Sequence, residues 1–521
     1  MKKNKYIFII IGLGLLIYFN SLFNNFVWDD EEQILNNQLI HSVRNVSIFF
    51  KGGTFNTGGS GNMMGVYYKP IMSICFSILY SLFGPRPFFF HSFQLIIHMI
   101  NTILIFYVLK KLFDNKPIAF LMSLIFLVHP INTESVVYIS ALQDVLFFFF
   151  GMLAFLIVIY KDRLRFPEFA FIFFCLLLSL LSKETGIIFL PIIFCYLFLF
   201  NKKQLLLFVN IFIFLICTYS ILRFGLANVG LTKFGISPIS RANLITRAIT
   251  VPKIVFFYLK TFLFPKNLSI LQHWLVKKIS FQDFYLPFMF DLTIFLFALF
   301  FYIKSRSKTF LFFMLWLIFA LSLHLHIFPL DMTVAERWFY LPMVGMLGII
   351  GIVIQELKIK NKNDVLKIKI FLIFIILILS LRTFLRTFDW RNGLILYGHD
   401  IKITHDTFDL ENNYGVELFR NNRIKESKKY FENSTRLAPY WWINWNNLGA
   451  AAEQEGNLIY AEKYYTNAIK NGDYYLAYQN YIRILVKENR ITEAKNFLTK
   501  VALIKFPQNP ELIRLYNLIQ N

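Results

Sequence analysis

The sequence is poor in acidic residues and in cysteine, and both shortages narrow what the protein can be. Only 31 of the 521 residues are Asp or Glu, against 53 Lys and Arg. The four cysteines stand singly in apolar surroundings without a CxxC pair, so we expect neither disulfides nor a metal site. The GxGxxG, Walker A, HExxH and GxSxG motifs are also absent, which leaves soluble nucleotide chemistry without support.

Apolar residues, in contrast, are abundant. The chain is 57% hydrophobic and 19% aromatic, and its mean hydropathy is +0.54. These values predict an all-α polytopic membrane protein. The net charge of +22 falls mostly in short runs between apolar segments, as in cytoplasmic loops, so we expect no nucleic-acid partner.

The first apolar run, Tyr6 to Phe23, follows three lysines and lacks a small-residue cleavage site after it. We therefore expect an uncleaved first span with its N-terminus inside. The next stretch, FVWDDEE at 26–32, places four consecutive carboxylates on the outer side. It is either a solvated acidic loop or the carrier of a catalytic base, and Asp29 and Asp30 are the candidates.

A long outer loop is expected over residues 25–87. Gly52 to Gly65 is so rich in glycine that it predicts a flexible hinge or lid. Tyr67 to Phe83 is apolar, begins at Lys69-Pro70 and ends before Gly84-Pro85. We expect a helix that lies against the membrane surface there, because a further span would disturb the charge pattern described next.

Basic runs near residues 110–116, 161–165, 202–203, 304–308 and 358–369 mark successive returns to the cytoplasm. The run 169–200 would be about 48 Å long as one helix, so we expect a hairpin that turns at Ser182–Gly186. Residues 247–265 are expected to be interfacial or re-entrant. The count is eleven spans within residues 1–388, and the C-terminus lies outside.

After Asp389 the composition becomes polar and a 34-residue period appears. Residues Trp445, Leu448, Gly449, Ala461, Tyr465 and Ala468 fit the tetratricopeptide (TPR) pattern, and Gly415, Ser427, Phe431 and Ser434 match one period earlier. We expect a linker at 389–404 and about three repeats at 405–521. Such repeats form an α-solenoid that binds peptides or partner proteins.

Each outer turn carries an acidic residue although acids are scarce. These turns offer Asp29 and Asp30; His129, Glu134 and Asp144; Lys183 and Glu184; and Asp331, Glu336 and Arg337. Charges at this depth are costly unless they face a cavity or one another. Together they suit a reaction in which a hydroxyl loses a proton and a phosphate leaves. The alternative to a catalytic role is structural: Lys183–Glu184 and Glu336–Arg337 are then simple ion pairs, and His129 is a residue that ends a helix. We expect no metal site.

The order of five motifs makes a family resemblance specific. FVWDD, YYKP with FFFHSFQLIIHMIN, HPINTESVVYISALQDVL, SKETG and AERWFYLPMVG, followed by the repeats, resemble the transmembrane and TPR repeat-containing proteins. These belong with protein O-mannosyltransferase-like enzymes of the GT-C superfamily. The resemblance implies a core of eleven spans and a donor sugar carried on a polyprenyl phosphate. No cofactor is certain, and the need for a divalent metal is open.

The resemblance also implies roles for particular residues. Asp29 matches the position of the base, with Asp30 beside it, and His129, Glu134 and Asp144 fall in the second outer loop of the active site. Lys183, Glu184, Glu336 and Arg337 fall where relatives hold the donor phosphate. The chain departs from the family at Ala141–Asp144, where relatives commonly have a Gly-Arg-x-Asp run, so the role of that arginine is unfilled.

The resulting hypothesis is an integral-membrane glycosyltransferase that transfers mannose or another hexose from polyprenyl phosphate to a hydroxyl, as on protein Ser or Thr. The reaction would occur on the non-cytoplasmic face, with the lipid donor and a protein acceptor as partners. Alternatives are a non-catalytic TPR scaffold, an enzyme that modifies lipid or glycan, and a transporter or polymerase. The setting is expected to be a bacterial inner membrane with a periplasmic TPR domain, or else the endoplasmic reticulum with a lumenal one.

Overall fold

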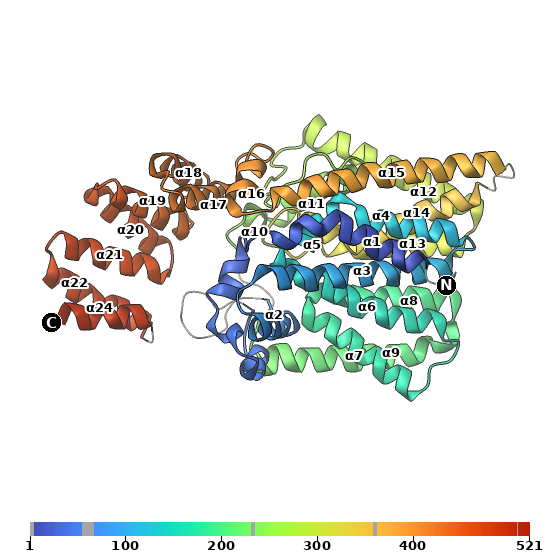
Figure 1. Ribbon diagram of the computed structural model, residues 1–521, viewed down its shortest axis with the longest axis horizontal. Helices are drawn as coiled ribbons and strands as arrows, with labels where there is room; N and C mark the ends of the chain where they lie inside the picture. Colours follow the sequence, from blue (N-terminus) through green and yellow to red (C-terminus); the bar gives the residue numbers. More distant parts are fainter. Residues whose placement is uncertain (1–4, 55–66, 231–234, 358–361, 508, 521) are drawn as a thin grey trace.

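The computed structural model describes residues 5–54, 67–230, 235–357, 362–507 and 509–520. Within these ranges every regular element is a helix and there is no strand, so the all-α prediction is confirmed. Long helices lie side by side in a bundle, and a smaller array of short helices extends from one end of it (Figure 1). The first described residues, at the start of α1, lie at the opposite end of the bundle from this array.

Among the described residues, the first half of the bundle contains nine α-helices, and short 3-10 or π helices lie between some of them. The α-helices are α1 (Lys5–Tyr18), α2 (Pro70–Phe83), α3 (Pro87–Leu112), α4 (Lys116–Val128), α5 (Thr133–Val137), α6 (Leu142–Tyr160), α7 (Phe166–Ser182), α8 (Phe189–Phe200) and α9 (Leu205–Ser220). A short helix at Glu184–Ile188 separates α7 from α8. The predicted turn at Ser182–Gly186 is therefore confirmed.

The second half of the bundle ends beside the array. Its helices are α10 (Pro238–Arg241), α11 (Leu244–Leu263), α12 (Leu286–Ser305), α13 (Lys308–Ser322), α14 (Pro342–Glu356), α15 (Lys362–Asp389) and α16 (Gly393–Asp400). α11 contains Arg247, Lys253 and Lys260 as well as Pro252. Its charges distinguish it from the apolar helices around it.

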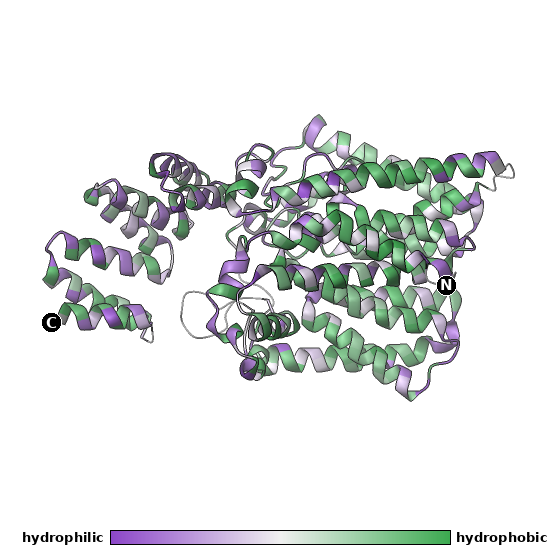
Figure 2. Ribbon diagram, viewed as in Figure 1, coloured by the Kyte–Doolittle hydropathy of each residue, from purple (hydrophilic) through white to green (hydrophobic). Residues whose placement is uncertain are grey.

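The outer helices of the bundle expose apolar side chains. Pro287 is the one buried side chain that α12 has within the described residues, and α15 exposes large residues such as Phe371, Phe374 and Leu377. Figure 2 shows these helices as hydrophobic along their length, with polar residues at their ends. Exposed apolar faces of this extent mark a surface that meets lipid rather than water.

Six described helices are long and apolar enough to cross a membrane. A seventh candidate is the pair α4 and Pro130–Val137, which is bent by 50° at a short break. Five further apolar helices are shorter: α2, α7, α13, α14 and the segment Glu184–Phe200. The structure thus establishes a membrane protein with several spans, and the number eleven stays a prediction.

The long outer loop folds against the end of the bundle nearest the array. It forms short helices at Glu31–Leu35, Gln38–His41 and Val43–Phe50. Most of the predicted glycine-rich hinge, Gly52 to Gly65, lies outside the described residues. The apolar stretch after it forms α2, which Figure 1 shows nearly end-on while the long helices lie in the plane.

Helix α3 positions the loops at this end of the bundle. It has a buried polar stripe at helical spacing that consists of His91, Gln94, His98 and Asn101. Gln94 donates to the carbonyls of Ser135 and Tyr138, both at 2.7 Å, and His91 contacts the carbonyl of Asn24 at 3.2 Å. Through these hydrogen bonds the stripe holds the segments that carry the acidic residues.

The C-terminal array (residues 408–520) consists of antiparallel helices that pack in chain order (Figure 1). They are α17 (Phe408–Arg420), α18 (Ile424–Leu437), α19 (Trp442–Gln454), α20 (Leu458–Asn471), α21 (Tyr475–Lys487), α22 (Ile491–Phe497), α23 (Leu503–Lys505) and α24 (Pro510–Gln520). Gly415 packs against Phe431 just as Gly449 packs against Tyr465. Equivalent contacts therefore recur in successive helix pairs, and the TPR assignment stays a prediction.

The stretch expected as a linker, 389–404, contains α16 and a buried ionic network. Arg386 donates to both carboxylate oxygens of Asp400, at 2.9 and 3.2 Å. Asp400 also accepts from the backbone of Ile270 at 2.9 Å, and His273 contacts Asp409 of α17 at 2.8 Å. These contacts hold the array against the bundle.

Candidate active site

The acidic stretch after the first span forms a turn that Asp30 holds together. Asp30 is fully buried and accepts hydrogen bonds from the backbone of Val27 at 3.0 Å and from the backbone and hydroxyl of Ser140 at 2.8 and 2.6 Å. Burial outweighs these bonds and raises the pKa of Asp30 to about 7. Trp28 has φ of 57°, a backbone conformation that few bulky residues adopt, so this turn is held in place by its contacts.

Asp29 lies on the other side of this turn and remains partly exposed. The hydroxyl of Tyr138 donates to its Oδ2 at 2.9 Å, and Trp28 stacks on the Tyr138 ring at 5.0 Å. Desolvation raises the pKa of Asp29 to about 6, although the Tyr138 bond and the charge of Arg337 act in the opposite direction. A carboxyl group with a pKa in this range is suited to accept a proton near neutral pH.

Three ion pairs involve most of the predicted residues, and the charges of Lys69 and Arg337 connect them with Asp29. The pairs are Lys183–Asp144 at 2.5 Å, Arg223–Glu184 at 2.8 Å and Arg337–Glu134. The backbone of Arg337 also donates to Glu134 at 2.9 Å, and the Arg337 guanidinium lies 5.7 Å from the Trp28 ring centroid. Turns from four separate parts of the sequence thus meet in one charged cluster.

Lys69 is a further cation of this cluster. Its side chain is only 7% exposed, and among the described residues no carboxylate lies within the 4.0 Å of an ion pair with it. The ammonium instead lies 4.0 Å from the centroid of the Tyr67 ring. Burial lowers the pKa of Lys69 to about 8, while Glu184 raises it and Lys183 lowers it further. A buried ammonium without a carboxylate partner favours an anionic ligand.

Asp331 joins the cluster from the turn before Glu336. The hydroxyl of Tyr67 donates to its Oδ2 at 2.9 Å, and its charge acts on both Asp29 and Lys69. Asp331 was named among the polar turn residues of the sequence without a role. The contact with Tyr67 places the end of the long outer loop over the charged cluster.

Two of the predicted site residues lie elsewhere. His129 contacts the Phe262 carbonyl at 2.9 Å and accepts a hydrogen bond from the Ile131 backbone at 3.2 Å, so both ring nitrogens bond to backbone atoms. Glu336 accepts from the Ser269 backbone at 2.6 Å, and its charge faces that of Arg386. Glu336 and Arg337 are neighbours whose side chains enter different networks.

Several residues of the site were not predicted from the sequence. They are Trp28, Lys69, Tyr138, Ser140 and Arg223. Lys69 and Trp28 belong to the quoted motifs YYKP and FVWDD, so position within a motif was an available signal. Arg223 follows an apolar helix and lies in no quoted motif, and its partner Glu184 is distant in sequence.

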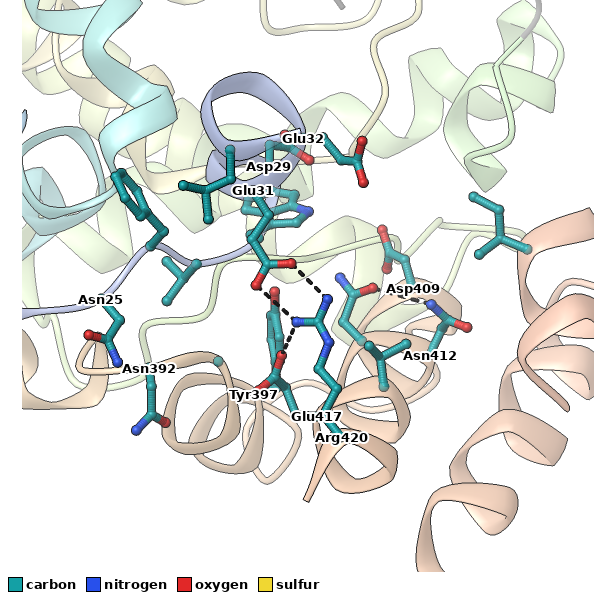
Figure 3. A pocket seen from close by; sticks show the side chains of 18 of the residues that line it. Asn25, Asp29, Glu31, Glu32, Asn392, Tyr397, Asp409, Asn412, Glu417 and Arg420 are labelled. Atoms are coloured by element: carbon teal, nitrogen blue, oxygen red, sulfur yellow. Dashed lines mark hydrogen bonds and ion pairs between the residues drawn. The ribbon is translucent and has the colours of Figure 1, made fainter. Parts of the chain in front are cut away.

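A cavity of about 630 Å³ opens beside Asp29, between the acidic stretch and the first helices of the array (Figure 3). Trp28, Asp29 and Glu31 line it on the bundle side, and Tyr397 of α16 and Arg420 of α17 line the other. Arg420 donates to both oxygens of Glu31, at 2.9 and 2.7 Å. The bundle and the array together form the cavity that gives access to Asp29, the candidate base.

Metal chemistry was left open by the sequence. In the part of the chain that the structure describes, no group of three or more His, Cys, Asp or Glu side chains could hold a metal ion. Glu134, Asp144 and Glu184 are each paired with Lys or Arg, as described above.

Comparison with known proteins finds relatives that cover most of this chain. A protein O-mannosyl-transferase of Caenorhabditis elegans is 28% identical over 449 residues, which are 83% of this chain and 62% of that protein. Human protein O-mannosyl-transferase TMTC3 is 26% identical in an alignment 489 residues long, which covers 84% of this chain and 52% of that protein. The chain thus spans roughly half to three fifths of the length of these relatives. No family model matches it.

Among solved structures, the apo form of the oligosaccharyltransferase of Archaeoglobus fulgidus aligns with a TM-score of 0.40 at 14% identity. The alignment covers 75% of this chain and 56% of that one. A TM-score of this size does not establish a common fold. The sequence comparison is the firmer finding: over most of its length the chain is similar to proteins named protein O-mannosyl-transferase, as its motifs indicate.

Proposed function

We propose that this chain is a membrane glycosyltransferase that transfers a hexose from a polyprenyl phosphate to the hydroxyl of a protein Ser or Thr. The observation that carries the proposal is the position of Asp29. Its carboxyl lines an open cavity and lies within the electrostatic reach of Lys69 and Arg337. Base, acceptor space and phosphate-binding charge therefore meet at one place. The names of the relatives favour mannose as the hexose.

The proposed reaction is a single displacement. The Asp29 carboxylate takes the proton of the acceptor hydroxyl while that oxygen bonds to the anomeric carbon of the sugar. The bond from the anomeric carbon to the phosphate oxygen breaks, and the polyprenyl phosphate leaves with its electron pair. Attack opposite to the leaving group inverts the anomeric centre. Asp30 holds the turn that carries Asp29 and takes no part in the proton transfer.

The leaving phosphate gains negative charge, which cations in a site of low dielectric stabilise strongly. Lys183 and Arg337 each already bind a carboxylate. Lys69 has no such partner within the described residues, so it is the cation most suited to contact the phosphate directly. Lys183 and Arg337 then supply a field that favours the departing charge.

The bundle and the basic runs support a membrane setting and an orientation. The six long helices, the bent pair and the four shorter helices α7, α8, α13 and α14 together support eleven crossings. An odd number agrees with the start of α1 and the array lying at opposite ends of the bundle (Figure 1). We place the array and the active site on the non-cytoplasmic face, in a bacterial inner membrane or else in the endoplasmic reticulum. Accessibility of single cysteines introduced at Asn471 and Ser305 to a membrane-impermeant reagent tests this orientation.

The decisive experiment measures sugar transfer by the purified full chain from mannosyl polyprenyl phosphate to a Ser- and Thr-containing peptide. Asp29→Asn is expected to lower kcat at least 100-fold, because general base catalysis typically contributes about 10² to 10⁴. Glu426→Gln, which removes a carboxylate from an exposed ion pair on α18, is the control and should keep full activity. Full transfer by Asp29→Asn would refute the base assignment, and transfer to lipid or glycan alone would refute the protein acceptor.

A further inference from the structure

Five asparagines of the array form one continuous row of hydrogen bonds. Each amide donates to the next in the order Asn480, Asn446, Asn447, Asn412 and Asn413, at 3.0, 3.4, 2.9 and 3.3 Å. The row starts on α21, crosses α19 and ends on α17. Side-chain amides that are joined in this way share a common direction and hold one another in place.

The row follows the repeat of the array. Asn446 and Asn480 are 34 residues apart, and Asn412 precedes Asn446 by the same interval. These three occupy equivalent positions in α17, α19 and α21, the first helices of successive pairs. The row is therefore a feature of the repeated architecture, and each helix pair contributes an amide to it.

Each amide of the row retains unused hydrogen-bonding capacity. An asparagine side chain has two N–H donors and two acceptor lone pairs, and a link in this row uses one of each. Asn413, Asn447 and Asn480 are partly exposed, whereas Asn412 and Asn446 are buried. The exposed amides thus offer a donor and an acceptor side by side, which are the groups that an extended peptide backbone needs.

The row leads into the cavity beside Asp29. Asn412 and Asn413 are part of the cavity wall, and Figure 3 shows Asn412 across the cavity from the acidic stretch. Val416, Trp441 and Ile443 supply apolar lining next to these amides. A volume of about 630 Å³ suits a ligand of drug size, hence a few residues of a peptide and not a folded domain.

The charge of the cavity wall selects among occupants. Arg420 is the one basic side chain among the described lining residues, and it is outnumbered by Asp29, Glu31, Glu32, Asp409 and Glu417. An anionic lipid phosphate is repelled by such a wall, because like charges in a partly buried site cost free energy. A segment with Lys or Arg near its hydroxyl residues is attracted.

We infer that the cavity and the asparagine row form a track for an extended, net basic segment of the acceptor polypeptide. The amides of Asn413, Asn447 and Asn480 bind its backbone, and the cavity brings a Ser or Thr hydroxyl to Asp29. This inference rests on the proposed function for the fate of the hydroxyl. The binding itself involves neither donor nor sugar, so it is tested separately.

The test uses the full chain in detergent and a fluorescent, unstructured peptide of Ser, Thr, Gly and Lys, with no donor present. Asn447→Ala and Asn480→Ala should each weaken binding of this peptide about threefold to tenfold, as expected for one or two lost hydrogen bonds. Asn471→Ala, on the exposed end of α20, is the matched control and should leave the affinity unchanged. Equal affinity of Asn447→Ala, Asn480→Ala and the unaltered chain would overturn the track.

A charge reversal tests the same track without touching the row. Glu32 is an exposed residue of the cavity wall, and Glu32→Lys should weaken binding of the Lys peptide and strengthen that of a matched Glu peptide. Equal affinity of the unaltered chain for both peptides, or equal binding of a folded Ser- and Thr-rich domain, contradicts the inference. If the asparagine variants transfer sugar and bind the peptide with unchanged affinity, the peptide track is refuted and the proposed function stands. If the chain binds the peptide but transfers no sugar, the proposed function is refuted and the track stands.

Discussion

Asp29 and Asp30 are neighbours in the sequence, and their carboxyl groups have different surroundings in the structure. Asp30 accepts three hydrogen bonds inside the protein, whereas Asp29 accepts one and lines the cavity. Trp28, with its unusual φ, lies directly before this pair. The sequence could identify the pair, but it could not separate their roles, because the partner Ser140 is far away in the chain.

The pH dependence of sugar transfer should report Asp29 and Lys69. Asp29 must be ionised to accept a proton, and its pKa is about 6, so kcat/KM should fall below about that pH. Lys69 must be charged to bind phosphate, and its pKa is about 8, so kcat/KM should fall again at higher pH. We expect a bell-shaped profile with limbs near these two values.

A matched variant assigns the alkaline limb of that profile. An arginine at position 69 stays charged throughout this range, so Lys69→Arg should extend activity to higher pH while the acidic limb stays in place. An alkaline limb that does not move in Lys69→Arg contradicts the role given to Lys69. Lys69→Met should raise the KM for the lipid donor more than the KM for the peptide.

Tyr138 tunes Asp29 through one hydrogen bond. That bond stabilises the ionised carboxylate and so lowers its pKa. Tyr138→Phe should therefore raise the pKa of Asp29 and move the acidic limb of the kcat/KM profile to higher pH, by roughly one unit or less. The pH profile of purified Tyr138→Phe measures this directly, and a shift to lower pH would contradict the geometry.

At the scale of helices, the array depends on glycines where helices meet. A Cβ at Gly449 would lie 2.6 Å from the Tyr465 ring, and one at Gly415 would lie 2.7 Å from the Phe431 ring. Gly449→Ala should destabilise the pair α19 and α20 by about 1–3 kcal/mol, the usual cost of overpacking. Hydrogen exchange of these two helices measures the loss.

A glycine in open space provides the control for that change. Gly12 of α1 has no heavy atom within 4 Å of an added Cβ in the described structure. Gly12→Ala should be neutral or slightly stabilising, because alanine has the higher helix propensity. Faster exchange confined to α19 and α20 in Gly449→Ala supports the packing argument, and unchanged exchange there contradicts it.

Much of the helical arrangement could be predicted from apolar runs and basic runs, because the membrane limits helix length and the direction of each crossing. The hairpin turn at Ser182–Gly186 is an example. Side-chain direction at the turns was not accessible in this way. Glu336 and Arg337 were assigned together because they are adjacent, yet Glu336 joins Ser269 and Arg337 joins Glu134. Short irregular turns have no periodicity from which such directions follow.

At the scale of the whole molecule, the Glu31–Arg420 pair connects the acidic stretch with the array. Both residues line the cavity and are partly exposed, so the pair should contribute no more than about 1 kcal/mol. Arg420→Glu should nevertheless widen the cavity by repulsion and raise the KM for an uncharged acceptor peptide, which gains no attraction from the added carboxylate. The double change Glu31→Arg with Arg420→Glu should restore it, and the four KM values form a double-mutant cycle.

The row of asparagines has a consequence for the order in which products form. Its amides contact the backbone, which is alike at every residue, so a bound chain can advance by one or two positions and regain equivalent bonds. Consecutive hydroxyls can then reach Asp29 within one encounter. If the proposed transfer occurs, we therefore expect it to be processive, so that polypeptides with several sugars accumulate while most acceptor molecules still carry none.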